Sequence, residues 1–207
     1  MAAREYRWRH LALLITILLL FVTAPFVVSL HDGILIMNVI SVTVLVAGSY
    51  ALSERKYLFA IAVVLSAITV AGTGLVLAFR QPWALLVSSS SIVVLVAFFC
   101  VTILSYVLGS GRVTSDKIFA AICVYMLLGY CWSFAYSILL ELQPGSFVSN
   151  SELVRNDYVG YGDIVPHSPA ARTMAILEAV MGQFYLVALV GRLVGLHIVH
   201  GNIERSR

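Results

Sequence analysis

Charged residues are scarce in this chain. Only 11% of its 207 residues are Asp, Glu, Lys or Arg, whereas 61% are hydrophobic, and the mean hydropathy is +0.98. Soluble domains carry roughly 25% charged residues, so this composition excludes a water-soluble fold. It predicts an all-α, polytopic membrane protein. The pI of about 8.8 reflects basic loops, and we expect no nucleic-acid partner.

Cysteine is also scarce, and its spacing shows no metal or disulfide pattern. Cys100, Cys123 and Cys131 all lie in apolar stretches, where small buried core residues are the simplest interpretation. The sequence has no paired carboxylates, nucleophile elbow or phosphate-binding loop, and its histidines form no metal-ligand set. We therefore expect no enzymatic activity, no metal site and no cofactor.

Long hydrophobic runs, by contrast, are abundant. A membrane-spanning helix needs about 20 mostly apolar residues, and six segments separated by short polar breaks meet this requirement. They cover residues 11–30, 34–52, 57–79, 83–109, 118–142 and 172–199. The first follows a basic N-terminus, but it is too long for a signal peptide and lacks a small-x-small cleavage site. We expect it to be retained as a membrane helix.

Basic residues are distributed unequally between the two sides of this predicted topology. If the N-terminus is internal, ten of the thirteen Lys and Arg residues fall on the cytoplasmic side. This bias predicts that both termini are cytoplasmic and that the segment between the fifth and sixth helices faces outward. Near the inner surface, Arg192, His197 and His200 are expected to contact lipid headgroups.

The outward segment contains two glycines that alternate with an aromatic residue, in the order Val159, Gly160, Tyr161, Gly162 and Asp163. Irregular backbone at membrane depth must be buried in protein or line a wet path. Glycine adopts φ values that other residues avoid, so successive carbonyls can point the same way. Carbonyls aligned in this manner can replace the water shell of a potassium ion.

Residues 113–200 resemble the pore module of the potassium channel superfamily, in particular bacterial six-span members with a VGYGDI-x-P signature. The order of outer helix, re-entrant loop and inner helix is the same, and residues 160–166 match the signature closely. The resemblance implies a homotetramer in a bacterial inner membrane, with K⁺ as the permeant ion and Asp163 as an outer acidic ring. The implied ion-coordinating residues are Tyr158, Val159, Gly160, Tyr161 and Gly162.

Two residues of the sixth helix have candidate roles. Glu178 lies roughly one turn into the inner helix, where a carboxylate is costly unless it has a partner. We expect it to support the filter from behind, with direct ion binding as the lesser alternative. Gly182 stands where the family often has a gate hinge, and glycine lowers the cost of bending a helix. Close packing between helices is an equal alternative for this glycine.

The chain departs from the family pattern at two places. Tyr158 stands where threonine is usual, and Asp157 replaces a second threonine. In addition, only thirteen residues separate Pro144 from Tyr158, about half the usual length of a turret and pore helix. A non-conducting or modulatory relative of the channels is therefore an alternative to a conducting one.

The sequence divides into two parts. Residues 1–112 resemble the sensor bundle of six-span channels but lack gating charges, because the fourth span holds no basic residue. Residues 113–207 form the pore-like module. A small-solute transporter is a third, less favoured interpretation, since transporters often have paired broken helices in two related halves and only one interrupted loop is present here.

Overall fold

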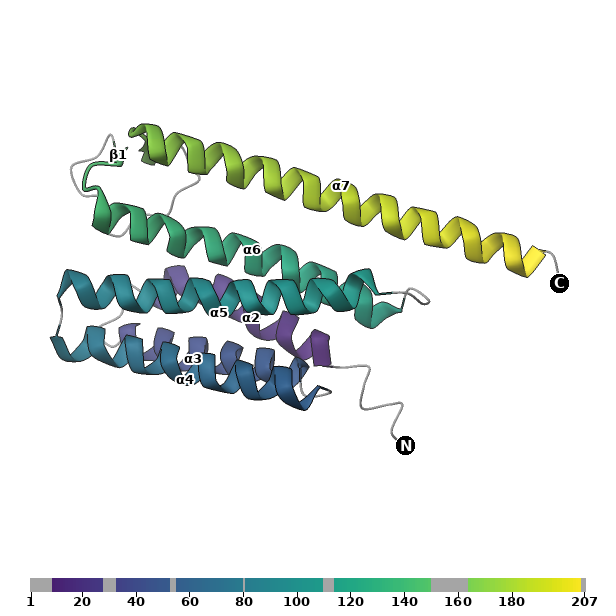
Figure 1. Cartoon of the computed structure of the whole chain (residues 1–207), viewed down its shortest axis with the longest axis horizontal. Coiled ribbons are helices and arrows are strands. Elements are labelled where there is room, and N and C mark those ends of the chain that lie inside the picture. The colour runs from purple at the N-terminus through teal and green to yellow at the C-terminus, as the bar shows by residue number, and fades with distance from the viewer. Residues whose placement is uncertain are drawn as a thin grey trace.

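The computed structural model describes residues 9–27, 33–52, 55–79, 81–109, 114–149 and 164–205. Within these ranges the chain forms six helices and one two-stranded ribbon (Figure 1). The elements are α2 (Arg9–Val27), α3 (Gly33–Ala51), α4 (Lys56–Phe79), α5 (Pro82–Leu108), α6 (Ser115–Leu142), β1 (Phe147–Ser149), β2 (Ile164–Pro166) and α7 (Pro169–Arg205). Each of the six predicted apolar segments is a helix, whereas the ribbon is an addition to the predicted all-α fold.

Four of the helices, α4 to α7, contain stretches that are long and apolar enough to cross a membrane. The apolar parts of α2 and α3 are shorter, at Arg9–Ala24 and Ile40–Ala51. The fold is thus that of a polytopic integral membrane protein. The crossing of the bilayer by all six helices and the re-entrant loop remain predictions.

Local signals explain where the helices begin. Pro82 opens α5 at a position where its missing N–H is not needed, directly after the extended residue Gln81. The start of α6 is capped by Thr114, whose side-chain oxygen accepts a hydrogen bond from the backbone N–H of Lys117 at 3.3 Å. Both helices start where the polar breaks in the sequence indicate.

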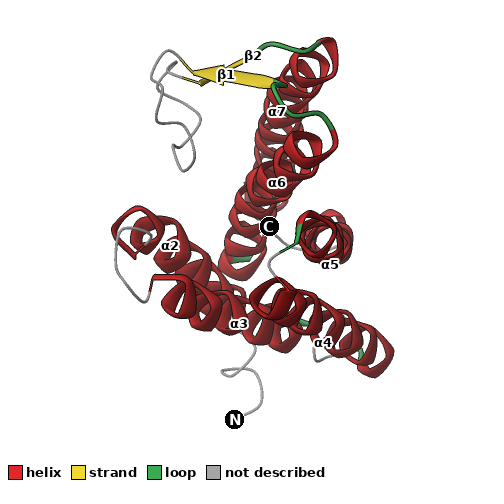
Figure 2. Cartoon of the chain, turned by 90° about the vertical axis from the view of Figure 1, so that its left-hand side faces the viewer, coloured by secondary structure: helices red, strands yellow, loops and turns green. Residues whose placement is uncertain are grey.

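The helix α5 is the centre of the bundle. It packs against α4 on one side and α6 on the other, while α2 packs against α3 and α6 (Figure 2). Leu95, Phe99 and Ile103 of α5 are almost completely buried, as are Leu13 and Ile17 of α2. The main core therefore belongs to the first five helices.

A glycine on α3 allows the central aromatic residue of this core to approach. A Cβ atom placed on Gly48 would lie 2.8 Å from Cε2 of Phe99, closer than real contacts allow. The ring of Phe99 thus occupies the space that a side chain at position 48 would need. This contact joins α3 to α5.

The helix α7 is attached to the bundle much less extensively. It contacts α6 and β2, and none of the residues in its most apolar stretch is buried. Figure 1 shows α7 running beside α6 and extending well past it toward the C-terminus. Ile176, Phe184 and Val187 are 64%, 71% and 69% exposed. One side of α7 is therefore open to lipid or to another chain.

We expect Phe99→Ala to destabilise the bundle by about 3–5 kcal/mol, because it leaves a cavity at the centre of the core. Val101→Ala on the same helix is the matched control, since Val101 is 66% exposed and its truncation should cost at most about 0.5 kcal/mol. Unfolding of the purified protein in detergent would measure both effects. Equal losses of stability would contradict this assignment of the core.

Candidate functional site

The predicted filter residues fall outside the described part of the chain. Tyr158, Val159, Gly160, Tyr161, Gly162 and Asp163 all belong to the segment 150–163, of which the structure gives no description. Their roles as ion-coordinating and outer-mouth residues stay predictions. The described residues on both sides of this segment show how its two ends are held.

A short antiparallel ribbon holds the two ends of the segment side by side. Phe147 pairs with Pro166, Val148 with Val165, and Ser149 with Ile164. The last residue before the segment and the first residue after it are therefore direct neighbours. A chain that enters and leaves a membrane from the same face requires its ends to be close together, and the ribbon meets this requirement.

Backbone hydrogen bonds fasten the ribbon to the helices around it. The carbonyl of Ser146, a residue that is 1% exposed, accepts hydrogen bonds from the N–H groups of His167 at 2.8 Å and Ser168 at 3.2 Å. The Ser168 hydroxyl oxygen in turn accepts a hydrogen bond from the N–H of Ala171 at 3.1 Å, which caps the start of α7. The end of α6 and the start of α7 thus form one hydrogen-bonded unit.

Glu178 contacts a tyrosine of the preceding helix. The hydroxyl of Tyr136, on α6, donates a hydrogen bond to Oε2 of Glu178, on α7. The ring of Phe147 packs edge-on against the ring of Tyr136, with centroids 5.4 Å apart. A continuous line of contacts therefore runs from the ribbon through α6 to the carboxylate on α7. The expected role of Glu178 behind the filter is not tested by this contact.

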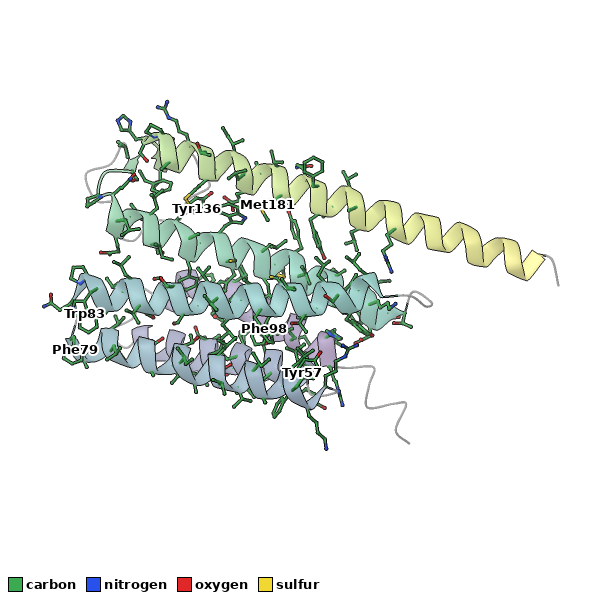
Figure 3. All side chains as sticks on the ribbon, viewed as in Figure 1. Tyr57, Phe79, Trp83, Phe98, Tyr136 and Met181 are labelled. Atoms are coloured by element: carbon green, nitrogen blue, oxygen red, sulfur yellow. The ribbon has the colours of Figure 1, made fainter. Side chains whose placement is uncertain are left out.

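Glu178 lines a cavity of about 500 Å³ that lies between α6 and α7 and is also bordered by Phe21 of α2. Trp132 and Gly129 line it from α6, and Glu178, Met181 and Gly182 line it from α7. Figure 3 shows Tyr136 and Met181 in the space between the two helices. The half-buried carboxylate of Glu178 therefore borders open volume on one side and its tyrosine partner on the other.

The structure bears on the two interpretations of Gly182. A Cβ atom at this position would meet no atom within 4 Å among the described residues. Close packing between the described helices of one chain therefore does not account for the glycine. Because α7 is continuous from Pro169 to Arg205, the proposed hinge is unbent in this conformation.

Two further side chains of α7, in the part beyond Gly182, bind the other helices. The hydroxyl of Tyr185 donates to the carbonyl of Ala121 at 2.6 Å. The guanidinium of Arg192 donates to the carbonyls of Leu108 and Gly109 at 2.7 and 2.8 Å. These carbonyls end α5, where they lack helical partners and carry partial negative charge. The lipid-headgroup contact expected for Arg192 stays a prediction, and its guanidinium contacts the end of α5.

Glu178, Tyr185 and Arg192 share one face of α7, because they are seven residues apart in sequence. All three make polar contacts to α6 or α5. The strongly exposed residues Phe184 and Val187 lie at other positions around the helix. The helix α7 therefore has one attached face and one free apolar face.

A second polar cluster joins the start of α2, the end of α5 and the start of α6. Oδ2 of Asp116 lies 2.7 Å from Nδ1 of His10 and accepts a hydrogen bond from the hydroxyl of Tyr106 at 2.9 Å. The rings of His10 and Tyr106 are stacked 5.0 Å apart. Lys117 donates to the Gly109 carbonyl at 3.0 Å, so the end of α5 is bound by cations from both α6 and α7.

No metal centre is evident in the described ranges, where no three His, Cys, Asp or Glu side chains come together. The ribbon, Tyr136 and the contact of Arg192 were missed in the sequence. Strands of three residues carry too little alternation to be detected. The sequence of an apolar helix does not indicate which residue a tyrosine within it contacts. The unpaired carbonyls at the end of α5 were the one available signal for Arg192.

Residues 158–196 match a protein family described as "Ion channel". The match covers well under half of the chain and includes the predicted filter segment, β2 and much of α7. No curated protein and no solved structure matched the chain. The match supports an ion-channel family of the potassium channel type, and thus ion transport across a membrane rather than enzymatic catalysis.

We expect the Tyr136–Glu178 contact to appear as an energetic coupling in a double-mutant cycle. Tyr136→Phe leaves the carboxylate without this donor, so combining it with Glu178→Leu should cost about 1–3 kcal/mol less than the sum of the single changes. Tyr185→Phe with Glu178→Leu is the control and should be additive within about 0.5 kcal/mol. Unfolding in detergent provides the measurement, and an additive Tyr136 cycle would contradict the contact.

We expect replacement of Arg192 to reduce the protection of nearby backbone N–H groups from hydrogen exchange. Arg192→Met keeps the apolar stem but removes the donors to α5, and hydrogen bonds to charged groups contribute about 1.5–3 kcal/mol. Hydrogen exchange at the C-terminal end of α5 should therefore accelerate about 10- to 100-fold. Arg172→Met is the control, because its single contact to the Pro166 carbonyl is long, at 3.4 Å, and exposed. Unchanged exchange in Arg192→Met would show that the contact does not hold α5.

Proposed function

We propose that this chain forms a homotetrameric, potassium-selective channel in a bacterial inner membrane, with both termini in the cytoplasm. One observation carries the proposal. The Gly-Tyr-Gly segment begins the stretch that matches the ion-channel family, and it is bounded by two apolar helices whose neighbouring ends are joined by the β1–β2 ribbon. This is the order of elements that a pore loop requires.

Backbone carbonyls are the proposed ion ligands. Carbonyls of Tyr158, Val159, Gly160 and Tyr161, with that of Gly162, would replace the hydration shell of K⁺. Asp163 would add a ring of negative charge at the outer mouth and raise the local cation concentration. Glu178 is proposed to support this segment from α7, held in place by Tyr136.

Four copies are proposed because each chain supplies a single filter segment. The free apolar face of α7, which carries Phe184 and Val187, leaves space for a neighbouring copy of the chain. Gly182 is the proposed gate hinge. Strong voltage dependence is not expected, because α5 contains no basic residue and a voltage sensor requires charges that move through the field.

A non-conducting member of the same family is the second candidate, and one structural observation favours it. The strand β1 occupies Phe147–Ser149, so only residues 150–157 remain for a pore helix before Tyr158. Eight residues form about two helical turns. A pore helix this short, together with tyrosine in place of threonine, would hold the filter weakly.

Potassium flux into liposomes is the direct test. We expect the wild-type protein to give a low flux above that of empty liposomes, and Gly162→Ala to reduce it about tenfold or more, because the added Cβ opposes the backbone conformation that aims the carbonyls. Gly129→Ala is the matched control, since a Cβ there meets nothing within 4 Å. Equal flux in Gly162→Ala and wild type would rule out this segment as the filter.

A separate variant tests the second candidate, the non-conducting relative. A chain carrying a full-length pore helix together with Tyr158→Thr should conduct markedly more than wild type if the scaffold is a competent pore. Wild-type protein without flux, combined with a folded but silent graft, would favour the non-conducting relative. Robust and selective wild-type flux would show that the short segment is sufficient.

A further inference from the structure

A second cavity lies in the first half of the molecule, away from the predicted filter. It measures about 450 Å³ and is enclosed by α3, α4, α5 and α6. Small-molecule sites in proteins are typically about 300–1,000 Å³ in volume. The buried side chains of Phe99 and Val96 form part of its wall, so it reaches the core of the bundle.

Hydroxyl groups are the only polar side chains among the described residues that line this cavity. They come from all four helices and belong to Ser41, Thr69, Thr73, Ser88 and Tyr130. No charged side chain is among the described lining residues. Because an unpaired charge in hydrocarbon is costly, a cavity of this kind favours an uncharged occupant.

The two threonines indicate which polar group the occupant should carry. Thr69 and Thr73 each donate their hydroxyl proton to a carbonyl of α4, at 3.0 Å in both cases. Their oxygens keep lone pairs that can accept a further hydrogen bond. The complementary ligand therefore carries a donor, such as a hydroxyl group.

The mouth of the cavity shows where the occupant comes from. Val42 of α3 and Val70 and Leu77 of α4 line it and are 41%, 47% and 44% exposed. These apolar residues belong to helices of a membrane protein, so the opening between them faces the bilayer hydrocarbon. A ligand dissolved in the membrane can reach the hydroxyl groups without crossing water.

The size of the cavity limits the occupant further. An apolar cavity of about 150 Å³ in a protein holds one benzene molecule, so about 450 Å³ suits a hydrocarbon segment with a small head group. A phospholipid with two acyl chains and a charged head is excluded by size and by charge. A single-chain, uncharged amphipath fits both the size and the uncharged lining of the cavity.

We propose that the cavity between α3, α4, α5 and α6 binds a neutral, hydroxylated single-chain membrane amphipath, such as a long-chain alcohol or a monoacylglycerol. Its hydroxyl group donates its one proton to the oxygen of Thr73, and its chain packs against Phe99 and Val96. This site does not depend on the pore proposal, because none of its lining residues belongs to α7 or to the filter segment.

Photolabelling of the full-length protein in phosphatidylcholine vesicles tests this site. The probe is hexadecanol with a mid-chain diazirine, compared with its methyl ether, which has no hydroxyl proton, and with the corresponding hexadecanoate. We expect mass spectrometry to place the labelled residues on α3 to α6 at the cavity. The alcohol should label about two- to tenfold more strongly than the ether, the range of one net hydrogen bond, and more strongly than the carboxylate.

Two variants distinguish binding in the cavity from recognition of the hydroxyl group. Gly74→Leu should fill the cavity and reduce labelling by the alcohol and the ether alike, since a Cβ at Gly74 meets nothing within 4 Å. Thr73→Val has nearly the same size and should remove most of the preference for the alcohol. Gly129→Leu on α6, which faces the cavity beside α7, is the control and should change neither.

Three results would overturn the proposal. Equal labelling by alcohol and ether in the wild type would show that no hydroxyl is recognised. Stronger labelling by the carboxylate would show that the ligand is charged. Labelling that persists in Gly74→Leu would place the probe on the outer surface of the helices. If Gly74→Leu does not fold, an alcohol preference that is unchanged in Thr73→Val would contradict the proposal by itself.

Discussion

The absence of water in the membrane interior is the constraint on which the rest of this structure depends. Polar groups at that depth must find partners within the protein. The threonines of α4 meet the requirement locally, by donating to carbonyls one turn earlier in the same helix. Tyr136, Tyr185 and Arg192 meet it across helices. These few polar side chains therefore set how neighbouring helices are oriented against each other. Hydrophobic burial alone does not set this orientation.

The predicted division of the chain after residue 112 stays a prediction, and it falls between two helices that pack against each other. The sequence separates residues 1–112 from the pore-like module, yet α6 packs more extensively against α5 than against α7. The helix α6 is therefore part of the core of the bundle as well as the outer helix of the pore-like half. Only α7 stands apart. Any change in the packing of α5 against α6 reaches α7 through the few polar contacts along its attached face.

The sequence predicted the helices well and their contacts poorly, for a physical reason. Long apolar runs between short polar breaks determine where helices lie, because each segment must satisfy its own backbone in the bilayer. Partners such as Tyr136 for Glu178 depend on how helices are rotated against each other, and almost uniformly apolar helices show little amphipathic pattern that would define the rotation. The Gly-Tyr-Gly segment was identified from its motif alone. Its role as a filter stays a prediction, because it lies outside the described residues.

The attached face of α7 also restricts how a gate could move. Gly182 lies between the contact of Glu178 with α6 and the contact of Tyr185 with the Ala121 carbonyl. A bend at Gly182 would leave the Glu178 contact and the ribbon in place, and would move the half of α7 that carries Tyr185 and Arg192. That half is bound to α6 and to the end of α5. It can therefore move away from the bundle only if these hydrogen bonds break, or if the end of α5 and the start of α6 move with it. In either case Arg192 connects the position of the bundle to the conformation of the proposed gate.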